Sequence, residues 1–135
     1  MKLGFSGTAK GMTDRQYAAV ETFVVGARSQ EGEGLEEAHH GDCVGADLEF
    51  HGIVMFRAQM IYVHPPSDPK ARAWTSNAII LPPKPYLARN KDIVDSTDVL
   101  LAAPEGEERS YPRSGTWATV RYAKARGKLV LVVYP

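Results

Sequence analysis

Nine consecutive residues, His39 to Asp47, contain the side chains that are best suited to chemistry. The segment HHGDCVGAD holds two imidazoles, two carboxylates and the only thiol of the chain, Cys43. Adjacent histidines on a strand point to opposite faces and no second ligand cluster accompanies them, so no metal site is expected. Gly41 and Gly45 permit a tight turn, after which Asp47 either caps a helix or accepts a hydrogen bond from a ribose hydroxyl. Both roles of Asp47 stay open, and Cys43 is expected to be a small neighbour of the site because no basic partner would activate it.

A second group of residues suited to binding lies in the segment SYPRSGTWAT, residues 110–119. There a guanidinium, two hydroxyls and backbone amides precede a predicted helix: Arg113, Ser114, Gly115 and Thr116. Such groups hold phosphates at helix N-termini. An ordinary helix start, with Ser114 as the capping residue and Arg113 in solvent, explains the same pattern. Both interpretations stay open.

Two shorter motifs offer further polar groups. The first predicted strand ends in GFSGT, where Ser6, Gly7 and Thr8 would let a phosphate approach backbone amides closely. A simple tight turn is the alternative. Arg89 and Asn90 open the motif RNKDIVD and form either an exposed helix face or part of a ligand clamp.

The order of predicted elements indicates how these motifs are positioned. Aliphatic and β-branched runs predict strands at residues 2–6, 37–40, 60–63, 98–103 and 129–134. Helical spacing of apolar residues predicts helices at residues 14–28, 48–58, 86–96 and 115–126. Residues 30–35 suit a surface turn, and residues 67–85, with four prolines, predict an ordered excursion.

This alternation predicts an α/β fold, a Rossmann-like three-layer sandwich with a mostly parallel central sheet. Ligands of such sheets bind at the carboxyl ends of the strands. The loops that follow the strands near residues 6, 40 and 104 should therefore meet at one edge.

Bulk composition limits the classes of partner. The length of 135 residues and a hydrophobic share of 44% suit one domain, residues 1–135. Sixteen basic and sixteen acidic residues cancel, so net charge favours neither a nucleic acid nor an anionic membrane as partner. One cysteine excludes an internal disulfide, no apolar run is long enough to cross a bilayer and no export signal is evident, so a cytoplasmic location is expected.

Together, GFSGT, HHGDCVGAD, RNKDIVDSTDVLLAAP and RSGTWATVRYAKARGKLVLVV resemble the SLOG superfamily along nearly the whole chain. That superfamily includes LONELY GUY phosphoribohydrolases and DprA-type DNA-processing proteins, and the likeness is greatest to the small YspA/YpsA-like group. The resemblance implies a Rossmann-like SLOG domain that binds a nucleotide or nucleotide-derived ligand, needs no further cofactor and is often a homodimer. It places the phosphate loop on Ser114, Gly115 and Thr116, the helix arginine on Arg89 and the ribose-side acid on Asp47.

The chain departs from the LONELY GUY pattern PGGxGTxxE at two places. Residues 111–114 replace the proline-glycine start, and Thr119 stands where that pattern has glutamate. A threonine neither stabilises an oxocarbenium ion nor activates water as a carboxylate does. The resemblance therefore does not imply cytokinin-type phosphoribohydrolase activity here.

Three functions follow as hypotheses. The first is binding of a nucleotide or nucleotide-derived phosphoester. The second is an N-glycosidase acting on nucleoside monophosphates, with Asp47 or Asp42 as the carboxylate and Arg89 as the second catalytic residue. The third is a DNA-linked accessory protein of DprA type, which the balanced charge disfavours. The expected ligand-binding residues are Ser6, Gly7, Thr8, Gly41, Asp42, Gly45, Asp47, Arg89, Asn90, Arg113, Ser114, Gly115 and Thr116.

Overall fold

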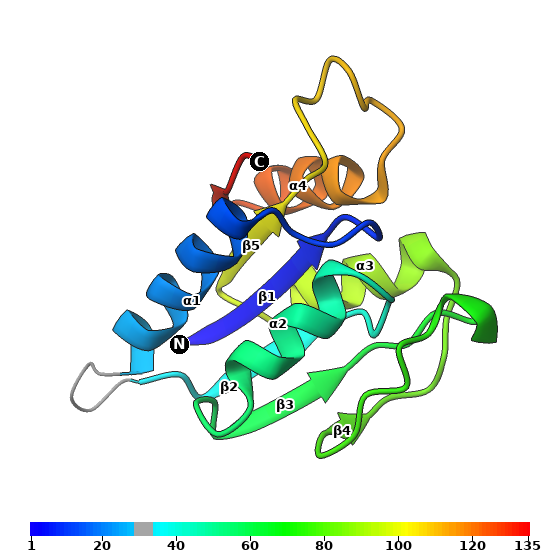
Figure 1. The fold of residues 1–135 in the computed structure, drawn as a ribbon. Coiled ribbons are helices and arrows are strands. Elements are labelled where there is room, and N and C mark those ends of the chain that lie inside the picture. Colours follow the sequence, from blue (N-terminus) through cyan, green and yellow to red (C-terminus); the bar gives the residue numbers. More distant parts are fainter. Residues whose placement is uncertain (29–33) are drawn as a thin grey trace.

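A six-stranded sheet forms the centre of the molecule. The structure, a computed structural model, describes residues 1–28 and 34–135, so most of the turn expected at residues 30–35 lies outside the described residues. All neighbouring strands are parallel, in the order β4-β3-β2-β1-β5-β6 (Figure 1). The strands are β1 (Lys2–Gly7), β2 (Glu37–His40), β3 (Met60–Val63), β4 (Ile79–Ile80), β5 (Val99–Ala103) and β6 (Leu129–Val132).

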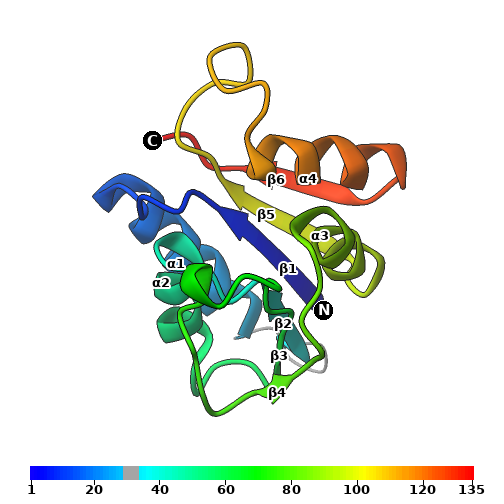
Figure 2. The same ribbon diagram turned by 90° about the vertical axis from the view of Figure 1, so that its right-hand side faces the viewer.

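Helices cover both faces of this sheet. Helices α1 and α2 lie on one face and α3 and α4 on the other (Figure 2). The helices are α1 (Asp14–Arg28), α2 (Ala46–Val54), α3 (Tyr86–Asp95) and α4 (Gly115–Ala125), with a short 3-10 helix η1 at Pro69–Ala71. The expected Rossmann-like three-layer sandwich is confirmed.

Each face has its own apolar core. Under α1 and α2, the ring of Phe5 from β1 stacks on Phe50 from α2 with centroids 4.4 Å apart. Under α3 and α4, Leu100 of β5 packs with Trp117 and Val120 of α4. Because β5 is covered on both faces, all five of its residues are buried. This explains why its sequence is continuously apolar instead of alternating.

Two elements differ from the sequence prediction. The excursion at residues 67–85 contains β4, whose two residues pair with Tyr62 and Val63 of β3. A two-residue strand is too short to give a periodic signal. Helix α2 begins at Ala46 and ends at Val54, whereas the prediction was residues 48–58. The other bounds agree within two residues.

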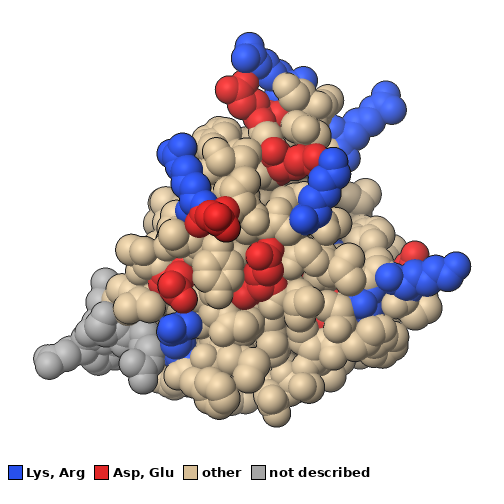
Figure 3. Space-filling model, in the orientation of Figure 1, with Lys and Arg blue, Asp and Glu red and all other residues tan. Residues whose placement is uncertain are grey.

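Charge is mixed on the face shown in Figure 3, where Lys and Arg side chains stand beside Asp and Glu side chains. Among the described residues, no helix is both long and apolar enough to cross a membrane.

Candidate ligand pocket

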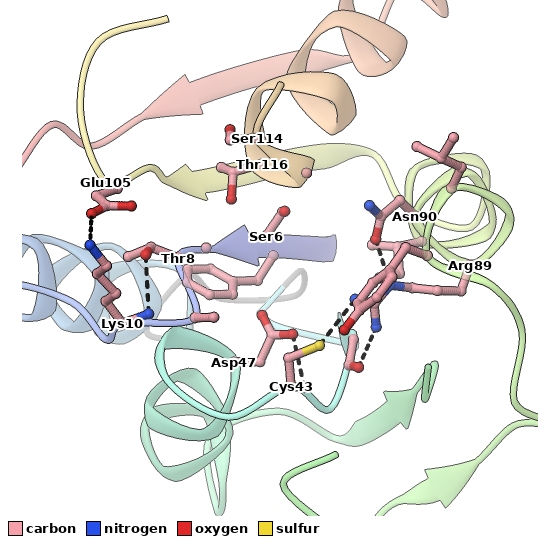
Figure 4. A pocket seen from close by; sticks show the side chains of 18 of the residues that line it. Ser6, Thr8, Lys10, Cys43, Asp47, Arg89, Asn90, Glu105, Ser114 and Thr116 are labelled. Carbon is pink, nitrogen blue, oxygen red and sulfur yellow. Dashed lines mark hydrogen bonds and ion pairs between the residues drawn. The ribbon is translucent and has the colours of Figure 1, made fainter. Parts of the chain in front are cut away.

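A cavity of about 560 Å³ lies at the carboxyl ends of β1, β2 and β5 (Figure 4). From β1 the chain proceeds to β2, β3 and β4 on one side and then returns to β5 on the other, so β1 and β5 flank the topological switch point. Ligand sites of parallel α/β sheets lie at this position. Eleven of the thirteen residues expected to bind ligand line the cavity: Ser6, Gly7, Thr8, Gly41, Asp47, Arg89, Asn90, Arg113, Ser114, Gly115 and Thr116.

The N-terminus of α4 forms one wall. The Ser114 hydroxyl accepts a hydrogen bond from the Trp117 amide at 3.0 Å, so Ser114 is the helix cap. Among residues 1–28 and 34–135, the amides of Gly115 and Thr116 find no acceptor, and the Thr116 hydroxyl finds no partner although only 6% of Thr116 is exposed. Unpaired amides at the positive end of a helix dipole favour an anion.

Asn90 of α3 adds an oriented amide to the same wall. Its Oδ1 accepts a hydrogen bond from Arg89 Nε at 2.6 Å, which leaves its NH2 group directed into the cavity (Figure 4). Nδ2 lies 4.0 Å from where a Cβ on Gly115 would stand. The NH2 group of Asn90 and the amide of Gly115 therefore face the same part of the cavity.

Arg89 holds the loop that follows β2. Its buried guanidinium donates to the carbonyls of Gly41 and His64, to Asn90 Oδ1 and to Cys43 Sγ, the last at 3.2 Å. A Cβ on residue 41 would overlap the guanidinium, so a larger residue there would displace Arg89 from these hydrogen bonds. Four of the five N–H groups are thus used, and one on Nη2 stays available to a ligand.

Asp47 lies in the first turn of α2 with its carboxyl group toward the cavity (Figure 4). Only 5% of the residue is exposed, and Oδ2 accepts the Cys43 amide hydrogen bond at 3.2 Å. Burial raises the pKa of Asp47 from 3.8 to about 6, although the positive charge of Arg89 opposes this shift. A carboxyl group with such a pKa can take up or release a proton near neutral pH.

Asp42, also expected to bind ligand, does not line the cavity. Its fully buried carboxylate accepts hydrogen bonds from Arg72 Nε at 2.9 Å and from the Thr75 amide and hydroxyl at 2.9 and 2.7 Å. These partners belong to the excursion at residues 67–85. Asp42 therefore fixes the excursion against the loop after β2 and is not a candidate catalytic carboxylate.

Gly45 also lies outside the cavity lining, and its role is steric. It has a φ of 92°, and a Cβ there would overlap the carbonyl of Ala9. The close approach lets the Ala46 amide donate to the Thr8 carbonyl at 3.0 Å. Gly45 thus joins the start of α2 to the loop after β1.

A chain of histidine hydrogen bonds supports the loop from behind. The Asp42 amide donates to His40 Nδ1 at 3.0 Å, so His40 carries its proton on Nε2 and donates to His51 Nδ1 at 2.8 Å. His51 Nε2 then donates to the Ser76 carbonyl at 2.8 Å. Burial lowers the pKa of His40 well below its usual value, so this imidazole is neutral. As expected of adjacent strand residues, His39 points the other way and bonds His64 at 2.8 Å.

Several lining residues were not singled out from the sequence. Lys10 and Glu105 form an ion pair of 2.5 Å, and Tyr86 and Leu87 of α3 form an exposed apolar wall. Lys10 comes four residues after Ser6, and Glu105 follows the end of β5. The sequence could have indicated these two residues only by their position, since both follow strands that end at this edge of the sheet.

Thr119, at the position of the LONELY GUY glutamate, is turned away from the cavity. It is buried, and its hydroxyl donates to the Gly115 carbonyl of its own helix at 2.7 Å. The carboxyl groups that line the cavity are those of Asp47 and Glu105. In the part of the chain that the structure describes, no three His, Cys, Asp or Glu side chains are grouped to hold a metal ion.

Comparison with known proteins informs the fold alone. No protein-family model and no curated protein sequence matches the chain. A solved structure described as the X-ray structure of TM1055, a target of the Northeast Structural Genomics Consortium, superposes with a TM-score of 0.63. The match covers 96% of this chain and 72% of that chain at 16% sequence identity. It supports the Rossmann-like fold, and the identity is too low to transfer a function.

Proposed function

We propose that the protein binds a nucleotide or a nucleotide-derived phosphoester, with a phosphate at the N-terminus of α4. One observation supports this most strongly. The amides of Gly115 and Thr116, the Thr116 hydroxyl and the NH2 group of Asn90 all line one cavity without a protein acceptor among the described residues. Several convergent donors at a helix N-terminus stabilise a phosphate better than a neutral ligand.

Other residues of the lining suit the nucleoside. Asp47 offers a buried acceptor to ribose hydroxyls, and Tyr86 and Leu87 offer exposed apolar surface to a base or sugar. A volume of about 560 Å³ lies within the usual range for small-molecule sites. Donors on one side and an acceptor on the other would orient such a ligand.

Isothermal titration calorimetry with nucleosides and their 5′-monophosphates tests this proposal. Thr116→Val should weaken monophosphate binding by about tenfold, because a hydrogen bond to a charged group is lost, and should not change nucleoside binding. Thr119→Val is the matched control: it lies in the same helix and donates to its own backbone, so it should leave both affinities unchanged. Equal affinity of the wild type for nucleosides and monophosphates would reject the proposal.

The cavity also suits a second candidate, an N-glycosidase acting on nucleoside monophosphates. The specific observation is the buried Asp47 carboxyl group, whose pKa of about 6 fits proton transfer or stabilisation of an oxocarbenium ion near neutral pH. In this reaction the C1′–N bond breaks, the oxygen of water bonds to C1′ and a proton passes to the departing base.

Chromatography of a nucleoside monophosphate panel would detect the released base. Asp47→Asn should abolish release and retain binding, since asparagine can still accept the hydrogen bond of the Cys43 amide. If the ionised form of Asp47 is required, the rate should rise with pH through about 6. Absence of base release by the wild type across the panel would exclude this candidate and leave binding as the function.

A further inference from the structure

An ion pair between Lys10 and Glu105 stands at the rim of the cavity (Figure 4). Lys10 belongs to the loop after β1 and Glu105 to the loop after β5, and both line the same cavity as the N-terminus of α4. The Lys10 ammonium lies 2.5 Å from Glu105 Oε1. A flexible cation thus stands beside a group of neutral hydrogen-bond donors.

The backbone beneath Lys10 is fixed. The Lys10 amide donates to Thr8 Oγ1 at 3.2 Å, and the Thr8 amide donates to the carbonyl of Ala103 at the end of β5 at 3.0 Å. The Lys10 side chain is 77% exposed, so its ammonium can move while its backbone stays in place. Glu105 follows Pro104, whose carbonyl accepts a hydrogen bond from the buried Gln16 side chain at 2.8 Å.

We propose that the ligand carries two linked phosphates, and that Lys10 binds the second by exchanging its Glu105 partner for a phosphate oxygen. This inference rests on the proposed function, in which the first phosphate binds the neutral donors at α4. It assigns Lys10 as a specificity residue and Glu105 as its competing partner.

Three features of the cavity support the exchange. An exposed ion pair contributes little to stability, so the replacement of Glu105 costs little. The donors of the first phosphate, namely Gly115 and Thr116 of α4 and Asn90 of α3, are uncharged and have limited capacity for the charge of a second phosphate. The other lining cations are Arg89, which is tied to four acceptors, and Arg113, which directly precedes Ser114 at the first phosphate. Lys10 is the lining cation of the loop after β1 and is held by one exposed ion pair.

Calorimetry at one fixed salt concentration tests the inference with two pairs of probes, inorganic phosphate against pyrophosphate and adenosine monophosphate against adenosine diphosphate. The wild type should bind each diphosphate about tenfold more tightly than its monophosphate, because a charge-assisted hydrogen bond is gained. Lys10→Met should remove this preference and leave monophosphate binding unchanged. Glu105→Gln should tighten diphosphate binding, because the competing carboxylate is gone.

Lys2→Met is the matched control. It removes the same charge from a lysine that pairs with Glu37 at 3.4 Å, at the opposite end of β1, and it should preserve the preference. Equal affinity of the wild type for both members of each pair would overturn the inference. A preference that survives Lys10→Met, or Glu105→Gln without effect on diphosphates, would overturn it too.

The outcomes separate this inference from the function on which it rests. If monophosphates bind and lose affinity in Thr116→Val but diphosphates show no advantage, the role of Lys10 alone is wrong. If no probe binds, or if Thr116→Val changes none of the affinities, the phosphate site itself is wrong and both proposals fail.

Discussion

Replacing Asp47 with asparagine should stabilise the folded protein at neutral pH, although it alters a residue of the cavity. The carboxyl group is buried and accepts a hydrogen bond from the Cys43 amide at 3.2 Å. The positive charge of Arg89 and the backbone amides of Cys43 and Gly41 together lower the pKa less than burial raises it. Asparagine keeps the shape and the hydrogen-bond acceptor and removes the ionisation.

The magnitude follows from the pKa. A rise from 3.8 in the unfolded chain to about 6 in the folded protein means that the folded state holds more protons than the unfolded state between these values. The contribution of Asp47 to the free energy of unfolding therefore falls as pH rises through this window. The total fall is about 3 kcal/mol, because each pKa unit corresponds to about 1.36 kcal/mol. The advantage of Asp47→Asn should accordingly be near zero at about pH 4 and approach 3 kcal/mol at about pH 8.

Urea unfolding of both proteins across this pH range measures the difference. Trp117 of α4 is buried in the apolar core between this helix and the sheet, so its fluorescence reports the loss of that core. Contributions of other titrating groups occur in both proteins and cancel in the comparison. Asp14→Asn, the same change at an exposed residue in the first turn of α1, is the control for the loss of one negative charge.

A pH-independent difference between wild type and Asp47→Asn would refute this reasoning. A difference that grows toward low pH would also refute it, because that sign requires a carboxylate stabilised by the fold.

Three further predictions concern residues around the cavity, the first with Gly52→Ala as its control. Gly45→Ala should destabilise the protein by about 2–4 kcal/mol in urea unfolding, because the residue has a φ of 92° and no space for a Cβ. Gly52→Ala, in the open interior of α2, should instead stabilise it by up to about 1 kcal/mol. Asp42→Ala should cost about 3–5 kcal/mol by leaving the Arg72 guanidinium and the buried Thr75 donors without their acceptor, and the ligand affinity of the remaining folded protein should be unchanged. His64, whose pKa burial lowers from 6.5 to about 4, holds fewer protons in the folded state, so stability should fall by up to about 3 kcal/mol as pH falls through this window. In His64→Gln that slope should disappear.

Contrary results have specific meanings. A Gly45→Ala variant as stable as Gly52→Ala would show that the loop after β1 can move away from α2. Selective loss of ligand affinity in folded Asp42→Ala would show that this carboxylate takes part in ligand binding. An unchanged acid slope in His64→Gln would assign the slope to other buried groups.

The main elements of the fold could be predicted from the sequence because their apolar spacing is long and regular. β5 is an apolar run bounded by Asp98 and Pro104, and α1 begins with the capping pattern in which Thr13 and Gln16 bond each other's amides. β4 could not be predicted because its two residues are strand only through pairing with β3. The path of the excursion at residues 67–85 likewise depends on contacts with residues distant in sequence, namely the pairing with β3 and the hydrogen bonds to Asp42.

The candidate site was predictable at the level of loops, and less so at the level of side chains. Parallel topology brings the loops after β1, β2 and β5 to one edge, whichever residues they contain. Between β2 and the first turn of α2, however, Asp47 faces the cavity while Asp42, with a φ of 55°, faces the excursion. The sequence gives these two carboxylates similar surroundings, and only the position of Arg72 and Thr75 separates them.

Residues missed at the rim illustrate the same limit. Lys10 and Glu105 are 95 positions apart, and they meet because β1 and β5 pair in register from Leu3↔Val99 to Gly7↔Ala103. A register between two strands so distant in sequence has no local signal, since it is set by the packing of both strands in the finished sheet.

The position of the cavity at the switch point has a consequence for motion across the molecule. Its walls come from residues 5–10 and 41–47 on the β1 side and from residues 86–93 and 105–116 on the β5 side, two halves that share the β1–β5 pairing at their centre. A molecule held by both walls opposes any fluctuation that separates the halves. Amide hydrogen exchange should then slow in β3 and β6, which contribute no residue to the cavity, as well as in the loops that do. Ligand binding at this small site would thus slow amide exchange on both sides of the sheet, away from the cavity itself.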